Sequence, residues 1–163
     1  MNTVTITIGS PLGPMRLYAD GDELVGVYMT DQAPPVAREQ SSAVLEQTAA
    51  QLAEYFAGQR RTFDLPLAPR GSGFQQIVWR ALTQIAYAET ASYGEIARTI
   101  GRPAASRAVG AANGRNPISI IVPCHRVVGA DGTLTGYAGG LPAKRWLLAH
   151  EQRHAMGSFQ LSC

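Results

Sequence analysis

The chain has 163 residues, of which 45% are hydrophobic and 16% charged, and its formal net charge is +2. This length suffices for one or two small domains with a buried core, and the composition is that of a globular protein. No apolar run approaches the roughly 20 residues that span a bilayer, so we expect no membrane segment. Two cysteines, Cys124 and Cys163, are too few for a disulfide framework and favour a reducing compartment.

The charge is unevenly distributed along the chain. Residues 1–69 carry 4 Lys or Arg and 8 Asp or Glu, a net of −4, whereas residues 70–163 carry 10 and 4, a net of +6. A basic half beside an acidic half is typical of a nucleic-acid-binding module attached to another domain, although charges over so few residues also fluctuate. Thirteen arginines against one lysine favour a GC-rich genome, and hence a bacterial cytoplasmic protein.

The first 72 residues have the pattern of a sheet and one amphipathic helix. β-Branched residues alternate at the start, and turn residues separate the apolar runs that follow. The expected elements are strands at Thr3–Ile8, Met15–Ala19 and Leu24–Met29, a proline-containing loop at 33–36, a helix at Ala43–Phe56, a strand at Thr62–Leu67 and a linker at 68–72.

The remaining residues favour helices. Ser92 and Glu95 have the spacing of a capping box, and a glycine turn separates the short helix that they open from the next one. Helix, glycine turn and helix within about twenty residues is the outline of a helix-turn-helix. The expected helices are Phe74–Ile85, Ser92–Ile100, Ala104–Asn113 and Pro142–Glu151.

The Ala104–Asn113 helix is built from small residues around one large polar residue, Arg107. Such a helix packs tightly against a neighbour, or it lets the backbone approach phosphates while Arg107 enters a narrow groove. The sequence alone leaves these two interpretations comparable.

The segment SIIVPCHRVVGADG places a thiol, an imidazole and a guanidinium in succession at Cys124, His125 and Arg126. A free cysteine is usually a small buried hydrophobe, but neighbouring cations or a base favour its reactive thiolate. Adjacent side chains on extended backbone point to opposite faces, so Cys124 and His125 need a local turn or a bridging water to interact. A carboxylate has to orient the imidazole. The acids of this half are Glu89, Glu95, Asp131 and Glu151, and Glu151 is the best candidate by elimination.

Three histidines and two distant cysteines have no zinc spacing, so we expect no metal.

These residues carry a family resemblance. PCHRV, preceded by RAVGAANGRNPISIIV and followed by GYAGGLPAKRWLLAHE, resembles the O6-alkylguanine-DNA alkyltransferases, also called methylated-DNA–protein-cysteine methyltransferases. The similarity runs from FQQIVWRAL to HE and extends more loosely to SPLGPMRL and LAEYFAG. It implies an α+β fold, with a ribonuclease H-like sheet-and-helix scaffold domain at 1–69. A helical, winged-helix-like domain at 70–163 is expected to bind DNA and accept the alkyl group.

The resemblance implies the roles of the active-site residues. Cys124 matches the alkyl acceptor, His125 the general base that acts through a water, and Glu151 the carboxylate that holds the histidine. Asn116 matches the asparagine that braces the active-site turn, and Tyr93 the tyrosine that donates to the leaving guanine and helps rotate its phosphate.

The resemblance also implies a DNA-binding surface and a base pocket. Arg107 matches the finger that fills the gap left by a flipped nucleotide. The expected DNA-binding residues are Tyr93, Arg107, Ala108, Gly110, Ala111 and Asn113. The expected pocket residues are Val127, Tyr137, Ala138 and Lys144, with the carbonyls of Cys124 and Val127 accepting from the guanine amine.

These roles predict a DNA repair protein that flips O6-alkylguanine, and O4-alkylthymine as well, out of duplex DNA. The alkyl group passes irreversibly to Cys124, and because a thioether has no easy hydrolysis route, each molecule reacts once without a cofactor. The expected partner is double-stranded DNA, bound through the minor groove by a monomer with little sequence preference. Cooperative binding is left open.

Two further classes remain as alternatives: a non-catalytic protein that binds alkylated DNA, and a Cys-His-Glu hydrolase of small acyl substrates. No feature marks the oxyanion hole that a hydrolase needs, and a pure binding module does not need Cys124. One departure from the family pattern is Ala138, where some members carry a serine that donates toward O6. Stabilisation of the leaving oxygen, and the range of adducts, are therefore in question.

Overall fold

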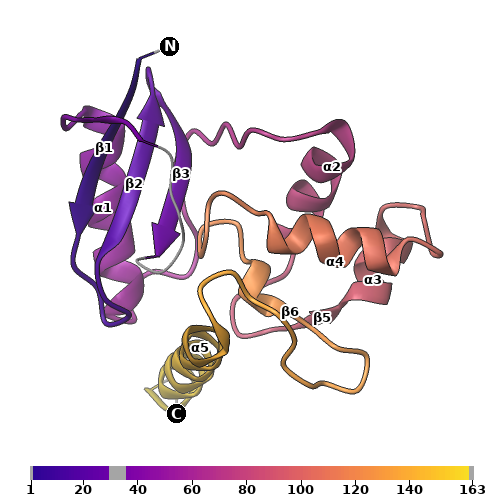
Figure 1. The fold of residues 1–163 in the computed structure, drawn as a ribbon. Helices are drawn as coiled ribbons and strands as arrows, with labels where there is room; N and C mark the ends of the chain where they lie inside the picture. Colours follow the sequence, from indigo (N-terminus) through magenta and orange to yellow (C-terminus); the bar gives the residue numbers. More distant parts are fainter. Residues whose placement is uncertain (1, 30–35, 162–163) are drawn as a thin grey trace. The chain divides into compact units, whose positions relative to one another are not determined.

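The structure is a computed structural model that describes residues 2–29 and 36–161, with side chains described as far as residue 156 (Figure 1). The chain divides into two compact units. The first comprises Met1–Arg70 with Pro117–Ile121, and the second comprises Gly71–Asn116 with Val122–Cys163. The loop expected at 33–36 lies outside the described residues, apart from its last residue.

A four-stranded sheet forms the centre of the first unit. Its strands are β1 (Thr3–Ile8), β2 (Met15–Asp20), β3 (Glu23–Met29) and β4 (Arg38–Glu39), in the order β3-β2-β1-β4. The first three pair antiparallel, and β4 runs parallel to β1. The strands expected at the N-terminus are confirmed. The two-residue β4 was not expected, because its sequence carries no alternating pattern.

Helix α1 (Ala43–Phe56) packs on this sheet and contacts β1, β2 and β3 (Figure 1). Its buried face includes Leu45, Leu52 and Tyr55, which are fully shielded from solvent. Ser42 caps its first turn, and Gly58, with a φ of 78°, lies in the turn just after its last residue. The helix expected at these residues is confirmed.

The strand expected at Thr62–Leu67 is not formed. The Gln51 side-chain amide bonds both backbone groups of Asp64, donating to its carbonyl and accepting from its N–H, each at 3.0 Å. Pro66 has no N–H to give to a ladder. Only an isolated bridge between Leu24 and Leu67 remains of the expected pairing.

The second unit is mainly helical. Its elements are α2 (Gly73–Leu82), β5 (Ala91–Ser92), α3 (Tyr93–Thr99), α4 (Ser106–Gly114), the 3₁₀ turn η1 (Cys124–Arg126), β6 (Val127–Val128) and α5 (Leu141–Leu161). Helices α2, α3 and α4 pack on one another, and the Trp79 indole of α2 donates to the Ala112 carbonyl of α4 at 2.8 Å. The two short strands, β5 and β6, pair in parallel.

Capping explains where two of these helices begin. Ser92 and Glu95 form the expected capping box at α3, and Ser72 and Gln75 form a second one at α2. The box at Ser72 differs from expectation, because the sequence predicts a linker at residues 68–72.

Three helix bounds differ from expectation by two residues or more. Helix α2 ends at Leu82 rather than Ile85, where the Thr83 hydroxyl bonds back to Arg80 O. Helix α4 begins at Ser106 rather than Ala104, because the two residues after Pro103 complete a turn. Helix α5 continues past Glu151 to Leu161. Among the described residues, no helix is long and apolar enough to cross a membrane.

Candidate active site and DNA-binding surface

The backbone before Cys124 makes two tight turns close together. Ile120 has a φ of 73°, and a 2.8 Å hydrogen bond between its two neighbours closes a γ-turn of the strained, left-handed kind. Pro123, with φ −82° and ψ 63°, forms the relaxed γ-turn, in which the Cys124 N–H donates to Val122 O at 2.8 Å. These turns end the apolar run and place Cys124 at the start of η1.

Two buried asparagines contact this turn. Asn116 Nδ2 donates to Val122 O at 2.8 Å, and that same oxygen accepts the Cys124 N–H. Asn113 Nδ2 donates to Cys124 O over a longer 3.4 Å, and its Oδ1 has no hydrogen-bond partner among the described residues. Asn116 is therefore the stronger support of the cysteine.

Cys124 is buried, with 3% of its surface exposed. Burial raises the pKa of its thiol to about 11, while the Asn116 side chain and the Lys144 ammonium act in the opposite direction. The thiol is the form present at neutral pH, so its reaction as a nucleophile requires a base.

His125 follows Cys124 in η1 and is fully buried. Its Nε2 is 2.8 Å from Glu151 Oε2, and its Nδ1 has no hydrogen-bond partner among the described residues. Burial lowers the pKa of His125, with Arg126 and Lys144 acting in the same direction and Glu151 against them. The imidazole is therefore neutral at pH 7, with Nε2 donating to the carboxylate and Nδ1 available as an acceptor.

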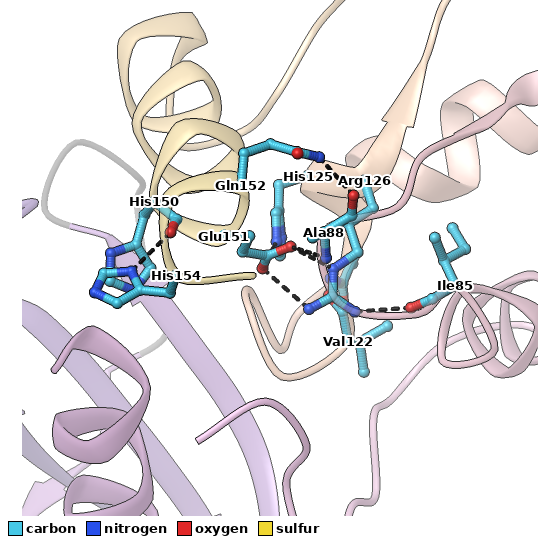
Figure 2. A network of polar contacts seen from close by, with 10 residues as sticks. Ile85, Ala88, Val122, His125, Arg126, His150, Glu151, Gln152 and His154 are labelled. Carbon is cyan, nitrogen blue, oxygen red and sulfur yellow. Dashed lines mark hydrogen bonds and ion pairs between the residues drawn. The ribbon is translucent and has the colours of Figure 1, made fainter. Parts of the chain in front are cut away.

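Glu151 extends from α5 to the centre of a buried polar network, shown in Figure 2. Its Oε1 accepts from Arg126 Nε at 2.9 Å and from the Ala88 N–H at 3.1 Å, and its Oε2 accepts from Arg126 Nη2 at 3.0 Å. Burial alone would raise the pKa of this carboxyl, but the bonds and charges of His125 and Arg126 hold it well below its ordinary value. Glu151 is an anion throughout the neutral range.

Lys144 is a second buried cation near Cys124. Its Nζ donates to Val127 O at 2.6 Å and to Thr135 O at 2.8 Å, which ties the loop after β6 to α5. The Thr135 hydroxyl is also 2.6 Å from the Tyr93 hydroxyl at the start of α3. Thr135 therefore connects the expected pocket lysine to the expected donor tyrosine.

The expected DNA-binding residues of α4 divide into two groups. Arg107, Ala108 and Ala111 are exposed, and Gly110 is half-buried beside the Tyr93 ring. Asn113 is instead buried against Cys124, so its side chain does not belong to that surface. Further exposed arginines lie on or beside α3 and α4 in the sequence, at Arg98, Arg102 and Arg115.

The expected pocket residues lie after η1. Val127, Tyr137 and Lys144 are buried, and Ala138 is exposed. Val127 O accepts from Lys144 Nζ, and Cys124 O accepts from the Val127 N–H and, over 3.4 Å, from Asn113 Nδ2. Among the described residues, no group of three or more His, Cys, Asp or Glu side chains is arranged to hold a metal ion.

Sequence reasoning missed two features of the site. The sequence indicates Arg126 only as a cation near the thiol, whereas in the structure it pairs with Glu151, 25 residues away. Thr135 was not considered, and no motif marks it.

The second unit thus combines exposed arginines on two packed helices with a buried Cys-His-Glu arrangement. This defines a class of protein that acts on nucleic acid through a cysteine. Residues 73–153 match the DNA-binding domain of 6-O-methylguanine DNA methyltransferases, and residues 4–69 match their ribonuclease-like domain.

Similar proteins are matched over nearly their full lengths. A methylated-DNA–protein-cysteine methyltransferase of Mycolicibacterium paratuberculosis is 50% identical over 158 residues, covering 95% of this chain and 96% of that protein. One from Methanosarcina acetivorans is 51% identical over 146 residues, covering 87% and 94%. The crystal structure of Mycobacterium tuberculosis OGT in complex with DNA matches with a TM-score of 0.88 and 50% identity, covering 93% and 94%. The chain therefore belongs to the 6-O-methylguanine DNA methyltransferase family, and it is a DNA-binding protein of DNA repair.

Proposed function

We propose that the protein repairs O6-alkylguanine in duplex DNA by transferring the alkyl group to Cys124. The observation that carries this proposal is the arrangement of His125, which follows the buried Cys124 in η1. Its Nε2 is held by Glu151 at 2.8 Å, while its Nδ1 has no partner among the described residues. A water bridging Nδ1 and the thiol lets His125 take the proton, and Glu151 stabilises the imidazolium that forms.

The transfer is a displacement at the alkyl carbon. The Cys124 sulfur forms a bond to that carbon as the bond from the carbon to O6 breaks, and the electron pair stays on guanine. Tyr93 donates a proton to the leaving base, and the proton taken from the thiol ultimately replaces it. The Thr135 hydroxyl, 2.6 Å from the Tyr93 oxygen, supports Tyr93 as a donor when it gives its own proton to that oxygen.

The product is a thioether, which has no easy hydrolysis route, so each molecule acts once and needs no cofactor. Since Ala138 offers no hydroxyl toward O6, Tyr93 supplies more of the stabilisation of the leaving base. The Val127 carbonyl, and the Cys124 carbonyl in place of its long bond from Asn113, accept from the guanine amine. The buried Tyr137 is a residue of the proposed pocket, and Asn116 holds the turn.

The target oxygen lies inside a stacked base pair, so the nucleotide has to be flipped out. The small exposed residues of α4, Ala108 and Ala111, suit close approach to a minor groove, and the exposed Arg107 has the length to fill the gap in the stack. The same proposal includes O4-alkylthymine as a second substrate, DNA binding as a monomer and a cytoplasmic location. It also gives residues 1–69 a scaffolding role beside an acceptor domain at 70–163.

Intact-mass spectrometry tests the transfer. The protein is mixed with a duplex that contains O6-methylguanine, beside the variants Cys124→Ala and Cys163→Ala. We expect the wild type and Cys163→Ala to gain one methylene per molecule and no more, with the label at Cys124, and Cys124→Ala to gain nothing. Binding of the duplex without a mass change would instead indicate a non-catalytic lesion-binding protein. If the protein did not bind the duplex and its mass did not change, the hydrolase hypothesis would be reopened.

A further inference from the structure

Arg126 is a buried cation that the alkyl-transfer proposal does not use. It is 6% exposed, and its guanidinium makes two bonds to the Glu151 carboxylate, at 2.9 and 3.0 Å. Its Nη1 donates to Ile85 O at 2.7 Å, and its Cζ lies 5.6 Å from the centre of the Tyr87 ring. Bonds to each of its three nitrogens make Arg126 a fixed part of the site (Figure 2).

Glu151 makes more bonds than are needed to orient His125. The histidine provides one bond to Oε2, whereas Arg126 contacts both oxygens and the Ala88 N–H contacts Oε1. A buried carboxylate needs a counter-charge, and Arg126 supplies a permanent one in bidentate geometry. His125 can then bond Glu151 as a neutral N–H donor, without carrying the balancing charge itself.

We propose that Arg126 is a positioning residue that keeps His125 neutral by balancing the charge of Glu151, so that His125 Nδ1 remains an acceptor for the Cys124 proton. This inference rests on the proposed function, because it concerns the same base. It assigns the residue after the histidine a role in setting the protonation state of the Cys124–His125 pair.

The charged and titratable groups around His125 are consistent with this role. Glu151 and Lys144 face it from α5, and Cys124 and Arg126 flank it in η1. Burial is the main factor that lowers the pKa of His125, and Arg126 and Lys144 add to it. Without the guanidinium, Glu151 would lose the cation that pairs with both of its oxygens. The Cys124–His125 pair would then hold an extra proton up to higher pH.

Four variants separate charge from hydrogen bonding. Arg126→Lys keeps the charge, and Arg126→Gln keeps a neutral donor without it. The double variant Arg126→Met with Glu151→Gln removes both buried charges and so avoids an unpaired one. Gln152→Ala is the matched control for loosening the loop, because exposed Gln152 donates to Ala88 O at 2.6 Å and carries no charge.

Two measurements are made on each protein. The first is the titration of the His125 ring by NMR in histidine-labelled protein. Because the chain has three histidines, the His125 signal is assigned from a His125→Gln variant. The second is the pH profile of single-turnover methyl transfer from the O6-methylguanine duplex. The NMR titration does not depend on activity, so a wild type that transfers no methyl group would contradict the proposed function and still test this inference.

In the wild type we expect His125 to titrate below pH 6.5, its ordinary value. Arg126→Gln should raise the midpoint by about one pH unit or more, with the acid limb of the transfer profile moving equally. The His125 midpoint should stay near the wild-type value in Arg126→Lys and Gln152→Ala. In the double variant it should lie at or below the wild-type value. An unchanged His125 midpoint in Arg126→Gln would overturn the inference. A raised His125 midpoint in the double variant would also overturn it, and this second test remains available if Arg126→Gln fails to fold. A purely structural role would lower the transfer rate at every pH without moving the limb.

Discussion

At the residue scale, one carbonyl oxygen connects the supporting asparagine to the nucleophile. Val122 O accepts from both the Cys124 N–H and Asn116 Nδ2, each at 2.8 Å. Because the two donors share this acceptor, the side chain of Asn116 holds the turn from which the thiol projects. Asn113 resembles it in type and burial but makes a weaker bond, so the two asparagines form a matched pair.

We expect Asn116→Ala to lower the free energy of unfolding by about 1–3 kcal/mol, because it removes a short buried hydrogen bond. Asn113→Ala should cost less than about 1 kcal/mol, since its bond is 3.4 Å long and its Oδ1 has no partner among the described residues. Methyl transfer should slow about tenfold or more in the Asn116 variant, because the thiol is misplaced. Urea denaturation and single-turnover assays check both. Equal losses of stability and of transfer rate in the two variants would argue against a special role for Asn116.

Much of the site could be anticipated at this scale, because PCHRV and the small-residue helix are local patterns. Ile120 is different. A β-branched residue normally indicates extended backbone, so its φ of 73° has no local signal. The pairing of Arg126 with Glu151 likewise depends on how α5 packs against η1, which adjacency along the chain does not encode.

At the scale of elements, two helices of the second unit begin with the same device. Ser72 caps α2 and Ser92 caps α3, each with a reciprocal bond from the residue three positions on. Their positions relative to the chemistry differ, since Tyr93 is the first residue of α3. Comparing substitutions of the two serines therefore distinguishes an effect on overall stability from an effect on the placement of Tyr93.

Ser92→Ala and Ser72→Ala should each cost about 1 kcal/mol of stability through loss of the cap. Only Ser92→Ala should also slow methyl transfer, by up to about fivefold if the whole cost falls on the transition state. Thermal denaturation and single-turnover rates make the comparison. If Ser72→Ala slowed transfer equally, the placement of Tyr93 by this cap would not explain the effect.

The elements that sequence patterns predicted well are those with regular periodicity: β1 to β3, α1 and the capped start of α3. The missing strand at Thr62–Leu67 shows the limit of such patterns. There the backbone of Asp64 is satisfied by the side chain of Gln51, which is 13 residues away. Local β-strand propensity cannot predict that a distant side chain takes the backbone hydrogen bonds that a neighbouring strand would otherwise make.

At the scale of the whole molecule, two buried groups link stability to pH. The pKa of His125 is lowered in the folded protein, so the stability that depends on its neutral form is present above its ordinary value of 6.5 and is lost as the pH falls below it. The pKa of Glu151 is also lowered, so its contribution is present above its ordinary value of 4.5 and is lost as the pH falls further. Both groups make the protein less stable in acid.

Between pH 6 and 5 we expect His125 alone to contribute a slope of up to about 1.4 kcal/mol per pH unit to the free energy of unfolding. His125→Gln should remove this part of the slope, whatever its effect at pH 7. Trp79 and Trp146 are the two tryptophans of the chain, and both belong to the second unit, so their fluorescence during urea denaturation reports on the unit that contains the site. An unchanged slope in the variant would contradict a neutral, buried His125.

The buried Lys144 has a consequence for what happens to the protein after it has reacted. It is the only lysine of the chain, and its Nζ is engaged by Val127 O and Thr135 O with none of the residue exposed. Acylating dyes, surface immobilisation and enzymes that attach degradation tags to lysine all require a free side-chain amine. The folded chain presents no such amine, so lysine-directed tagging of spent molecules would have to wait until the loop around Thr135 has come away from α5.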